Sequence, residues 1–152
     1  MKKISSLFAS VICAAAVMAF TASQALAGEG WLTNLEKAQE QAKKEGKLVF
    51  LEFTGSDWCP PCIALKKKVL GTEEFAAFAK DNLVLVEIDF PIRKPLDPAQ
   101  KKYNDDLAKK YKLEGVPMVL VFDGGGKELS KDVGFSGDSV AQYIAKLKKL
   151  KK

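Results

Sequence analysis

Apolar residues along the chain form runs whose spacing changes between that of strands and that of helices. Largely apolar runs over residues 47–54, with Glu52 as an exception, and 83–90 predict strands buried on both faces, as in a parallel sheet. A shorter apolar run over 117–122 is followed by the turn residues 123–126, which predict a hairpin in which 127–134 pairs back. Helical spacing predicts helices over 33–45, 63–70, 72–80, 98–111 and 138–150. The pattern therefore predicts an α/β fold in which helices flank a mixed, four-stranded sheet.

The ends of the first helix carry recognisable signals. Thr33-Asn34-Leu35-Glu36 fits a capping box, and Gly46 fits the C-terminal stop. Trp31, just before the helix, is expected to pack it onto the sheet. A proline-rich loop over 91–98 separates the second predicted strand from the helix over 98–111.

Residues 1–27 have the pattern of a secretory signal peptide rather than of a folded domain. Lys2 and Lys3 form a charged start, residues 7–20 an uncharged and mostly apolar core, and Ala25-Leu26-Ala27 a small-residue cleavage site. An uncleaved membrane anchor is the alternative, but the apolar core is shorter than the roughly 20 residues that a spanning helix needs. We therefore predict export to the periplasm, cleavage after Ala27, and a single domain over residues 28–152.

Composition excludes several classes of enzyme. The chain has three cysteines and no histidine, which excludes Ser-His-Asp hydrolysis, Cys-His proteases, and zinc or copper sites that need imidazole. Cys13 lies within the signal, so the mature domain keeps only Cys59 and Cys62. Loss of the two signal lysines lowers the net charge from +5 to +3. The lysine-rich tail over 146–152 is interpreted as a solvated helix end rather than as a membrane or nucleic-acid site.

The two remaining cysteines form a Cys-x-x-Cys pair, Cys59-Pro60-Pro61-Cys62, between a predicted strand and a predicted helix. A structural disulfide would close only a short loop and would stabilise little. A zinc site needs four ligands, and there is no second Cys-x-x-Cys. The context after a strand favours the third interpretation, a redox dithiol, because the N-terminus of a helix lowers the pKa of a cysteine.

Two motifs at their respective positions carry a resemblance to a known family. Trp58-Cys59-Pro60-Pro61-Cys62 resembles the redox site of the thioredoxin superfamily, and Gly115-Val116-Pro117 resembles its cis-proline loop. The resemblance runs from about Gly30 to the end of the chain. It is strongest to secreted bacterial thioredoxin-like proteins, including the C-terminal periplasmic domain of the disulfide interchange protein DsbD. It implies a thioredoxin-like fold with an extra N-terminal helix and the strand order 83–90, 47–54, 117–122, 127–134.

The resemblance also implies a role for each residue of the two motifs. Cys59, at the helix start and more exposed, is the expected nucleophile, and the more buried Cys62 resolves the mixed disulfide. Trp58 is expected to cover the sulfurs and contact the substrate, although it also reads as a packed aromatic at a loop–helix joint. Pro117 is expected to be cis, so that the backbone of Val116 meets the dithiol and pairs with an extended substrate.

Glu52 is a lone carboxylate in an otherwise apolar strand. It either lies at a strand end near solvent, or acts as the buried acid that exchanges protons with the second cysteine in this family. It stands one residue further from Cys59 than the family pattern has it, so the loop 55–57 would carry an insertion. Asp57, in that loop, is expected to be exposed. Lys67 occupies the position of the family's kink proline, which predicts a straighter helix.

These expectations combine into a periplasmic thiol-disulfide oxidoreductase that works as a disulfide reductase on exported proteins. Pro60 and Pro61 have no N–H to stabilise a thiolate at Cys59, and Lys66 is expected to be solvated, so the pKa of Cys59 is only moderately lowered. The alternatives are an oxidase, or a client-specific or non-catalytic binding module for cytochrome or metal-centre assembly. We expect no cofactor, no metal and no nucleic acid. The expected partners of this monomer are protein disulfides and a membrane or periplasmic redox partner.

Overall fold

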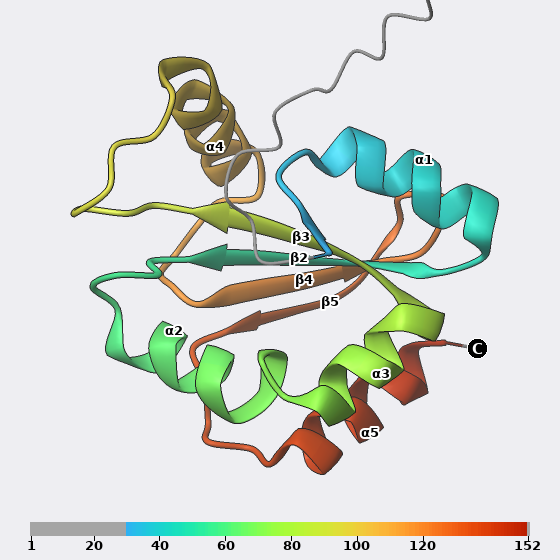
Figure 1. Cartoon of the computed structure of the whole chain (residues 1–152). Helices are drawn as coiled ribbons and strands as arrows, with labels where there is room; N and C mark the ends of the chain where they lie inside the picture. Colours follow the sequence, from blue (N-terminus) through green and yellow to red (C-terminus); the bar gives the residue numbers. More distant parts are fainter. Residues whose placement is uncertain (1–29, 152) are drawn as a thin grey trace, which may run out of the picture.

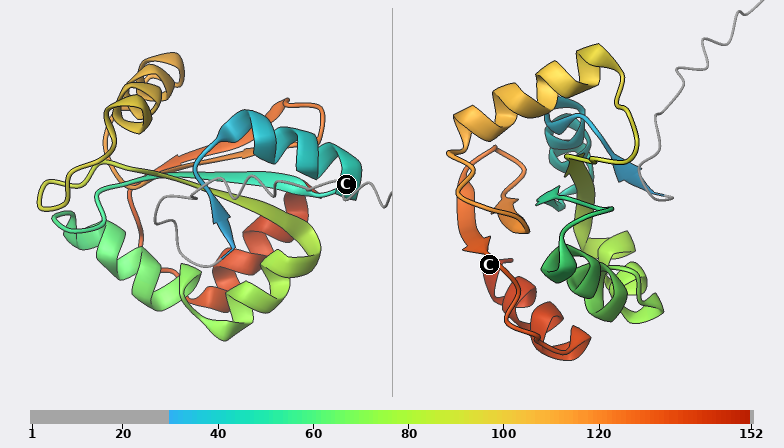
Figure 2. Two further views of the ribbon diagram at one scale, coloured as in Figure 1. Left: turned by 45° about the horizontal axis from the view of Figure 1, so that its top comes forward. Right: turned by 90° about the vertical axis from the view of Figure 1, so that its left-hand side faces the viewer.

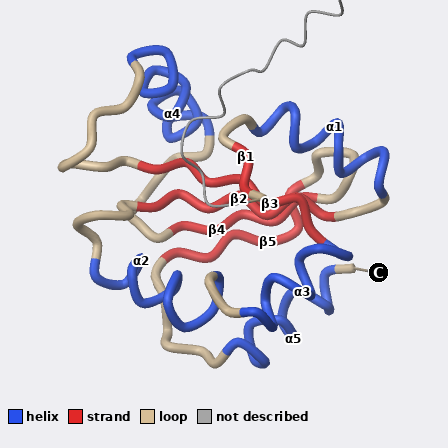
Figure 3. The backbone as a smooth tube through the Cα atoms, viewed as in Figure 1, coloured by secondary structure: helices blue, strands red, loops and turns tan. Residues whose placement is uncertain are grey.

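The computed structural model describes residues 30–151, which form one sheet covered by helices on both faces (Figure 1). The sheet has five strands in the order β1-β3-β2-β4-β5. Their bounds are β1 Trp31–Leu32, β2 Leu48–Thr54, β3 Leu83–Asp89, β4 Met118–Phe122 and β5 Glu128–Val133. β2 runs parallel to β3 and antiparallel to β4, and β5 closes a hairpin with β4 (Figure 3). The mixed sheet and the order of its four longer strands are as predicted.

The prediction of four strands was wrong by one, because β1 escaped the sequence pattern. Trp31 and Leu32 pair in parallel with Leu85 and Val86 at the edge of the sheet. Two residues are too few to show a period of two, so no pattern marks them as a strand. Membership of the sheet also corrects the expected role of Trp31.

Trp31 does not pack the first helix onto the sheet. Successive side chains of a strand leave opposite faces. Trp31 is buried with Phe50 and Phe75 on one face, whereas Leu35 of the helix packs on the other. The rings of Trp31 and Phe50 meet edge to face, with centroids 6.0 Å apart. Trp31 therefore closes the core on the side opposite to the helix that follows it.

Helices divide between the two faces of the sheet (Figure 2). α1 (Leu35–Glu45) and α4 (Pro98–Lys110) cover one face, and α2 (Pro60–Leu65), α3 (Glu73–Asn82) and α5 (Val140–Leu150) cover the other. Each face has its own apolar core. Phe53, Met118 and Leu120 contribute to the first core, and Phe50, Leu65 and Phe75 to the second. In the part of the chain that the structure describes, no helix is both long and apolar enough to span a membrane.

Capping residues define where α1 begins and ends. Its N-cap is Asn34, whose side chain accepts a hydrogen bond from the backbone N–H of Lys37, so the capping box expected to start at Thr33 is not formed. Gly46 ends the helix with a φ of 66°, the left-handed conformation that glycine adopts without a steric penalty. The residue type of the stop was therefore predicted correctly, and the start was displaced by one residue.

The helix after the two cysteines is not regular, although the missing kink proline predicted a straighter helix. It is α-helical only from Pro60 to Leu65, and a π-helical turn, η1, follows from Lys66 to Leu70. A π turn inserts an extra residue into the hydrogen-bond ladder and turns the side chains that follow. Here Val69 and Leu70 are both buried in the core, so a helix without the kink proline still changes its winding at the same place.

Candidate active site

Both cysteines lie at the carboxyl end of β2, where the chain passes into α2. Cys59 is the N-cap of α2, and its Sγ accepts a hydrogen bond from the backbone N–H of Cys62 at 3.3 Å. The two residues are joined by a disulfide, with their Cα atoms 5.3 Å apart. Pro60 and Pro61 occupy the first turn, whose N–H groups would have no intrahelical partner. The structure therefore represents the oxidised state of the pair.

Exposure hardly distinguishes the two cysteines, although the resemblance implied a more exposed Cys59. Cys59 is 2% exposed and Cys62 is 1% exposed, so both side chains are buried to nearly the same degree. The loop of Val116 lies against the sulfur of Cys59, as the resemblance implied. What separates the cysteines is their position: Cys59 lies at the cap, and Cys62 lies inside the first turn against the sheet.

The cis-proline loop lies against Cys59. The peptide bond between Val116 and Pro117 is cis. The carbonyl oxygen of Val116 lies 3.6 Å from the Sγ of Cys59, although the two residues are 57 positions apart in sequence. Pro117 is buried and Val116 is half-buried. The antiparallel pairing of β4 with β2 produces this approach, because it brings the start of β4 to the end of β2.

Trp58 lies on the loop before the dithiol, and its side chain is held by contacts with Phe90 and Gly55. Its side chain is 43% exposed, and its Nε1–H donates to the carbonyl oxygen of Phe90 at 2.7 Å. A side chain at Gly55 would put its Cβ 2.5 Å from a ring atom of Trp58. Only glycine leaves room for the indole there. The indole is therefore fixed in place with a large part of its surface open beside Cys59.

Two polar residues of the same loop fasten the segment that follows β3. Ser56 donates from its backbone N–H and its hydroxyl to the carboxylate of Asp89, at 2.9 and 2.6 Å. Asp57 accepts the backbone N–H groups of Ile92 and Arg93, at 3.0 and 2.7 Å. These bonds lower the pKa of Asp57. Asp57 was expected to be merely exposed; it is half-buried and holds the proline-rich loop beside the dithiol.

Glu52 lies at the centre of β2 and is buried, with 1% of its surface exposed. It faces the same side of the sheet as Phe50, the side that α2 covers. Burial raises its pKa to about 8; the negative charge of Glu87 adds to the rise, and the positive charge of Lys66 opposes it. Its Oε2 has no hydrogen-bond partner among the described residues. Glu52 and Cys62 line one cavity of about 370 Å³.

Lys66 is not simply solvated. Its Nζ lies 3.1 Å from Oε2 of Glu87 and 4.5 Å from the centroid of the Trp31 ring, and 42% of its side chain is exposed. The ammonium group therefore lies between the carboxylate of Glu87 on β3 and the ring of Trp31. Sequence reasoning also missed Glu87. The available signal was a second carboxylate inside an apolar strand, in the position that pairs with Glu52.

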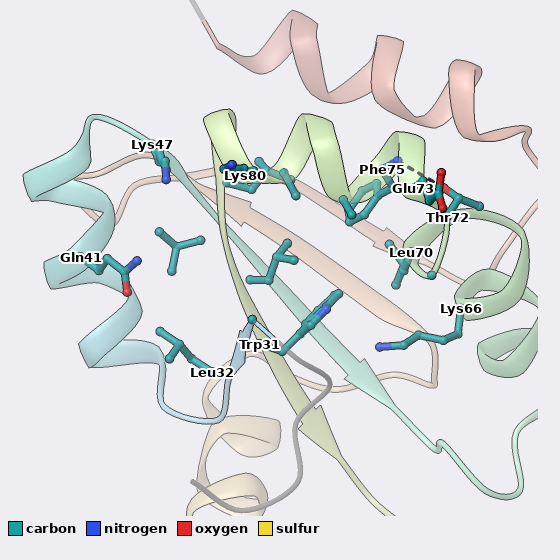
Figure 4. A pocket seen from close by; sticks show the side chains of 17 residues that line it. Trp31, Leu32, Gln41, Lys47, Lys66, Leu70, Thr72, Glu73, Phe75 and Lys80 are labelled. Atoms are coloured by element: carbon teal, nitrogen blue, oxygen red, sulfur yellow. Dashed lines mark hydrogen bonds between the residues drawn. The ribbon is translucent and has the colours of Figure 1, made fainter. Parts of the chain in front are cut away.

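A larger cavity lies away from the dithiol. It has a volume of about 720 Å³ and is lined by residues of β1, β3 and α3, with Trp31, Phe75 and Lys66 among them, but by neither Cys59 nor Cys62 (Figure 4). The chemistry therefore belongs to the smaller cavity beside Cys62. Within residues 30–151, no group of three or more histidine, cysteine, aspartate or glutamate side chains is placed to hold a metal ion.

Comparison with known families agrees with this geometry. A family model described as thioredoxin-like matches residues 30–124, which include both cysteines and the Val116–Pro117 bond. The chain belongs to the thioredoxin-like family.

Relatives within this thioredoxin-like family carry out disulfide chemistry by name. The chain is 38% identical over 112 residues to the disulfide bond reductase DsbH of Chlamydia pneumoniae, covering 74% of this chain and 67% of that protein. It is 28% identical over 99 residues to the thiol:disulfide interchange protein DsbD of Actinobacillus pleuropneumoniae. That match covers 64% of this chain but only 15% of that protein.

Solved structures extend the same comparison. A DsbH oxidoreductase matches with a TM-score of 0.72 at 33% identity, over 85% of this chain and 92% of the other. The reduced C-terminal domain of DsbD from Neisseria meningitidis matches with a TM-score of 0.56 at 26% identity, over 76% of this chain and 92% of the other. With its Cys-x-x-Cys pair in this thioredoxin-like fold, the chain is a thiol-disulfide oxidoreductase of the DsbH type.

Proposed function

We propose that this protein is a periplasmic disulfide reductase, in which the Cys59–Cys62 dithiol donates electrons to disulfides of exported proteins. The name of the similar Chlamydia protein, a disulfide bond reductase, supports the direction. The signal-like pattern of residues 1–27, which lie outside the described residues, supports export, cleavage after Ala27 and a mature domain over residues 28–152. The protein acts as a monomer and receives electrons from a membrane or periplasmic redox partner.

The surroundings of the Cys59 sulfur carry the assignment of direction. The only backbone N–H bonded to it within the described residues is that of Cys62, because Pro60 and Pro61 have none to give. The nearby Val116 carbonyl is an acceptor, which favours a neutral thiol over a thiolate. The ammonium group of Lys66 forms an ion pair with Glu87 and not with the sulfur of Cys59. A thiolate with so little support gives a stable disulfide and a dithiol that readily donates electrons.

The reaction follows from the positions of the two cysteines. The thiolate of Cys59 attacks one sulfur of the substrate disulfide, forms a Cys59–substrate disulfide and releases the first substrate thiolate. Cys62 then loses its proton to Glu52 and attacks the Sγ of Cys59. This forms the Cys59–Cys62 disulfide and releases the second substrate thiolate. The substrate gains two electrons and the dithiol loses them, so no cofactor or metal takes part.

The surface around the dithiol supports binding of an extended polypeptide. The exposed large apolar side chains in the described part of the chain are Trp58, Ile63, Ile92 and Val133. Each adjoins a residue of the site: Trp58 and Ile63 flank the cysteines, Asp57 binds the backbone of Ile92, and Val133 pairs with Met118. Trp58 contacts the substrate side chains, and the backbone of Val116 beside Pro117 pairs with the substrate strand.

Equilibration of the purified mature protein with glutathione buffers tests the direction. We expect a reduction potential in the range of thioredoxin, about −270 mV, and reduction of insulin when dithiothreitol supplies electrons. A potential near that of a strong oxidant, about −120 mV, would replace the reductase with an oxidase. Failure to reduce insulin at a thioredoxin-like potential would restrict the protein to a dedicated client.

A further inference from the structure

Lys66, Glu52 and Glu87 lie together at the cavity beside Cys62. The proposed reaction uses only Glu52. Glu52 and Glu87 are partners in the parallel pairing of β2 and β3, so their side chains leave the same face of the sheet. Lys66 reaches them from the first residue of η1. All three residues line the cavity that also contains Cys62.

The ammonium group of Lys66 is committed to one of the two glutamates. It lies 3.1 Å from Oε2 of Glu87, and no ion pair joins it to Glu52 among the described residues. Its second contact is the face of Trp31, 4.5 Å from the ring centroid (Figure 4). Glu52 is left with an oxygen, Oε2, that has no partner in the described part of the chain.

Glu87 and Lys66 have opposite effects on the pKa of Glu52. The charge of Glu87 raises the pKa of Glu52, and that of Lys66 lowers it. Asp89, further along β3, adds to the rise, and Tyr143 of α5 also faces this carboxyl group. On β4 the register partner is the apolar Val119. The loop side of the cavity adds two more charged groups, Lys94 and Asp97.

We propose that Glu87 and Trp31 hold the Lys66 ammonium away from Glu52, and that this arrangement decides whether Glu52 carries a proton when Cys62 reacts. The inference rests on the proton exchange proposed between Glu52 and Cys62. In the disulfide state Glu52 is protonated at neutral pH. When the disulfide is reduced, Cys62 takes that proton as it leaves as a thiolate; when Cys62 attacks, it returns the proton to Glu52. Glu87 and Lys66 are positioning residues that act through Glu52.

Titration of the oxidised protein by carboxyl-carbon nuclear magnetic resonance tests the electrostatic part without any turnover. Glu87→Gln removes a like charge and frees Lys66 to pair with Glu52, so the midpoint of the Glu52 signal should fall by roughly one pH unit or more. Lys66→Met should raise the midpoint, because two carboxyl groups without a cation hold a shared proton more tightly. The double variant should lie between the two.

Matched variants control for changes in structure. Lys67→Met removes an exposed lysine next in sequence and should leave the midpoint of Glu52 unchanged. Lys66→Arg keeps the charge and should restore a midpoint near that of the unmodified protein. If Glu87→Gln fails to fold, Glu87→Asp combined with Lys66→Met supplies the comparison. If Lys66→Met fails to fold, Lys66→Arg combined with Glu87→Gln supplies it. Shifts in the same direction, or no shifts, would overturn the proposal.

A kinetic experiment tests the connection to Cys62. Reduced protein is mixed with an aromatic disulfide whose released thiolates are coloured, and the second release reports the attack of Cys62 on the mixed disulfide at Cys59. Its pH profile should move down in Glu87→Gln and up in Lys66→Met, while the first release keeps its profile. Shifted carboxyl midpoints with unshifted second-release profiles would refute the role of this arrangement and of Glu52, but not exchange by the two cysteines themselves.

Discussion

At the scale of single residues, position rather than exposure separates the two cysteines. Both are buried to nearly the same degree. Cys59 lies at the cap of α2, with its sulfur close to the carbonyl oxygen of Val116, where we propose that the substrate binds. Cys62 instead shares a cavity with Glu52 beneath that surface. The assignment of attack to Cys59 and of resolution to Cys62 therefore depends on what each sulfur faces.

Trapping experiments test this division of labour. Cys62→Ser should accumulate mixed disulfides with substrate proteins through Cys59, because the attack takes place and the resolving thiol is missing. Cys59→Ser should accumulate almost none, because Cys62 does not face the substrate. Non-reducing electrophoresis of extracts from cells that export each variant measures the adducts. Equal trapping by the two variants would contradict the assignment.

At the scale of elements, two loops form one platform beside the dithiol. Ser56 and Asp57, in the loop between β2 and α2, bind the end of β3 and the segment that follows it through four hydrogen bonds, and Trp58 adds a fifth. The loop 55–57 thus has a structural role. It provides side chains that hold Ile92 at the edge of the site, with 74% of its surface exposed.

Asp57→Ala should loosen this platform without touching the cysteines. We expect a several-fold loss of kcat/KM with an unfolded protein disulfide, because ordering the loop on binding then costs conformational entropy. The rate with a small aromatic disulfide should change little, because such a substrate does not reach the loop. Steady-state kinetics with both substrates measure the contrast. Asp105→Ala, on the outer surface of α4, is the control. A parallel loss with both substrates would show that Asp57 acts on the dithiol instead.

At the scale of the whole molecule, the helices on one face of the sheet enclose a carboxyl group that folding must keep protonated. The pKa of Glu52 is about 8 in the folded chain, whereas a glutamate that is not buried has a pKa of 4.5. The folded state therefore binds a proton that the unfolded state releases between these two values. Below pH 4.5 the ionisation of Glu52 does not affect the free energy of unfolding. As the pH rises from 4.5 to about 8 the free energy of unfolding falls, and above pH 8 the full loss is reached.

Glu52→Gln should remove this dependence on pH. The amide keeps the shape of the protonated acid and never ionises, so the variant should be more stable than the unmodified protein above pH 8. The gain is at most about 5 kcal/mol by the relation between pKa and free energy, and it should vanish near pH 4. Chemical denaturation of the oxidised protein across this range measures it. A constant difference in free energy of unfolding at all pH values would show that Glu52 does not titrate in this way.

The sequence alone determined the elements and the chemistry, because both depend on local order. Apolar runs marked three of the four longer strands, and the turn residues 123–126 placed the fourth. The pair of cysteines in a chain without histidine left redox chemistry as the favoured interpretation. The turn residue Gly46 marked the end of a helix, since its conformation is set within a few residues. The two-residue strand at Trp31 was beyond reach, because a pattern needs several repeats to be visible.

Only the tertiary structure decided which distant groups surround the sulfur atoms. The distance between Val116 and Cys59, the hold of Asp57 on the proline-rich loop and the ion pair between Lys66 and Glu87 join residues from 21 to 57 positions apart. Strand register creates these contacts, and a shift of one residue would send Glu87 to the opposite face from Glu52. Burial then sets the charge of Glu52, because the cost of ionisation depends on everything packed around the carboxyl group and not on its neighbours in sequence.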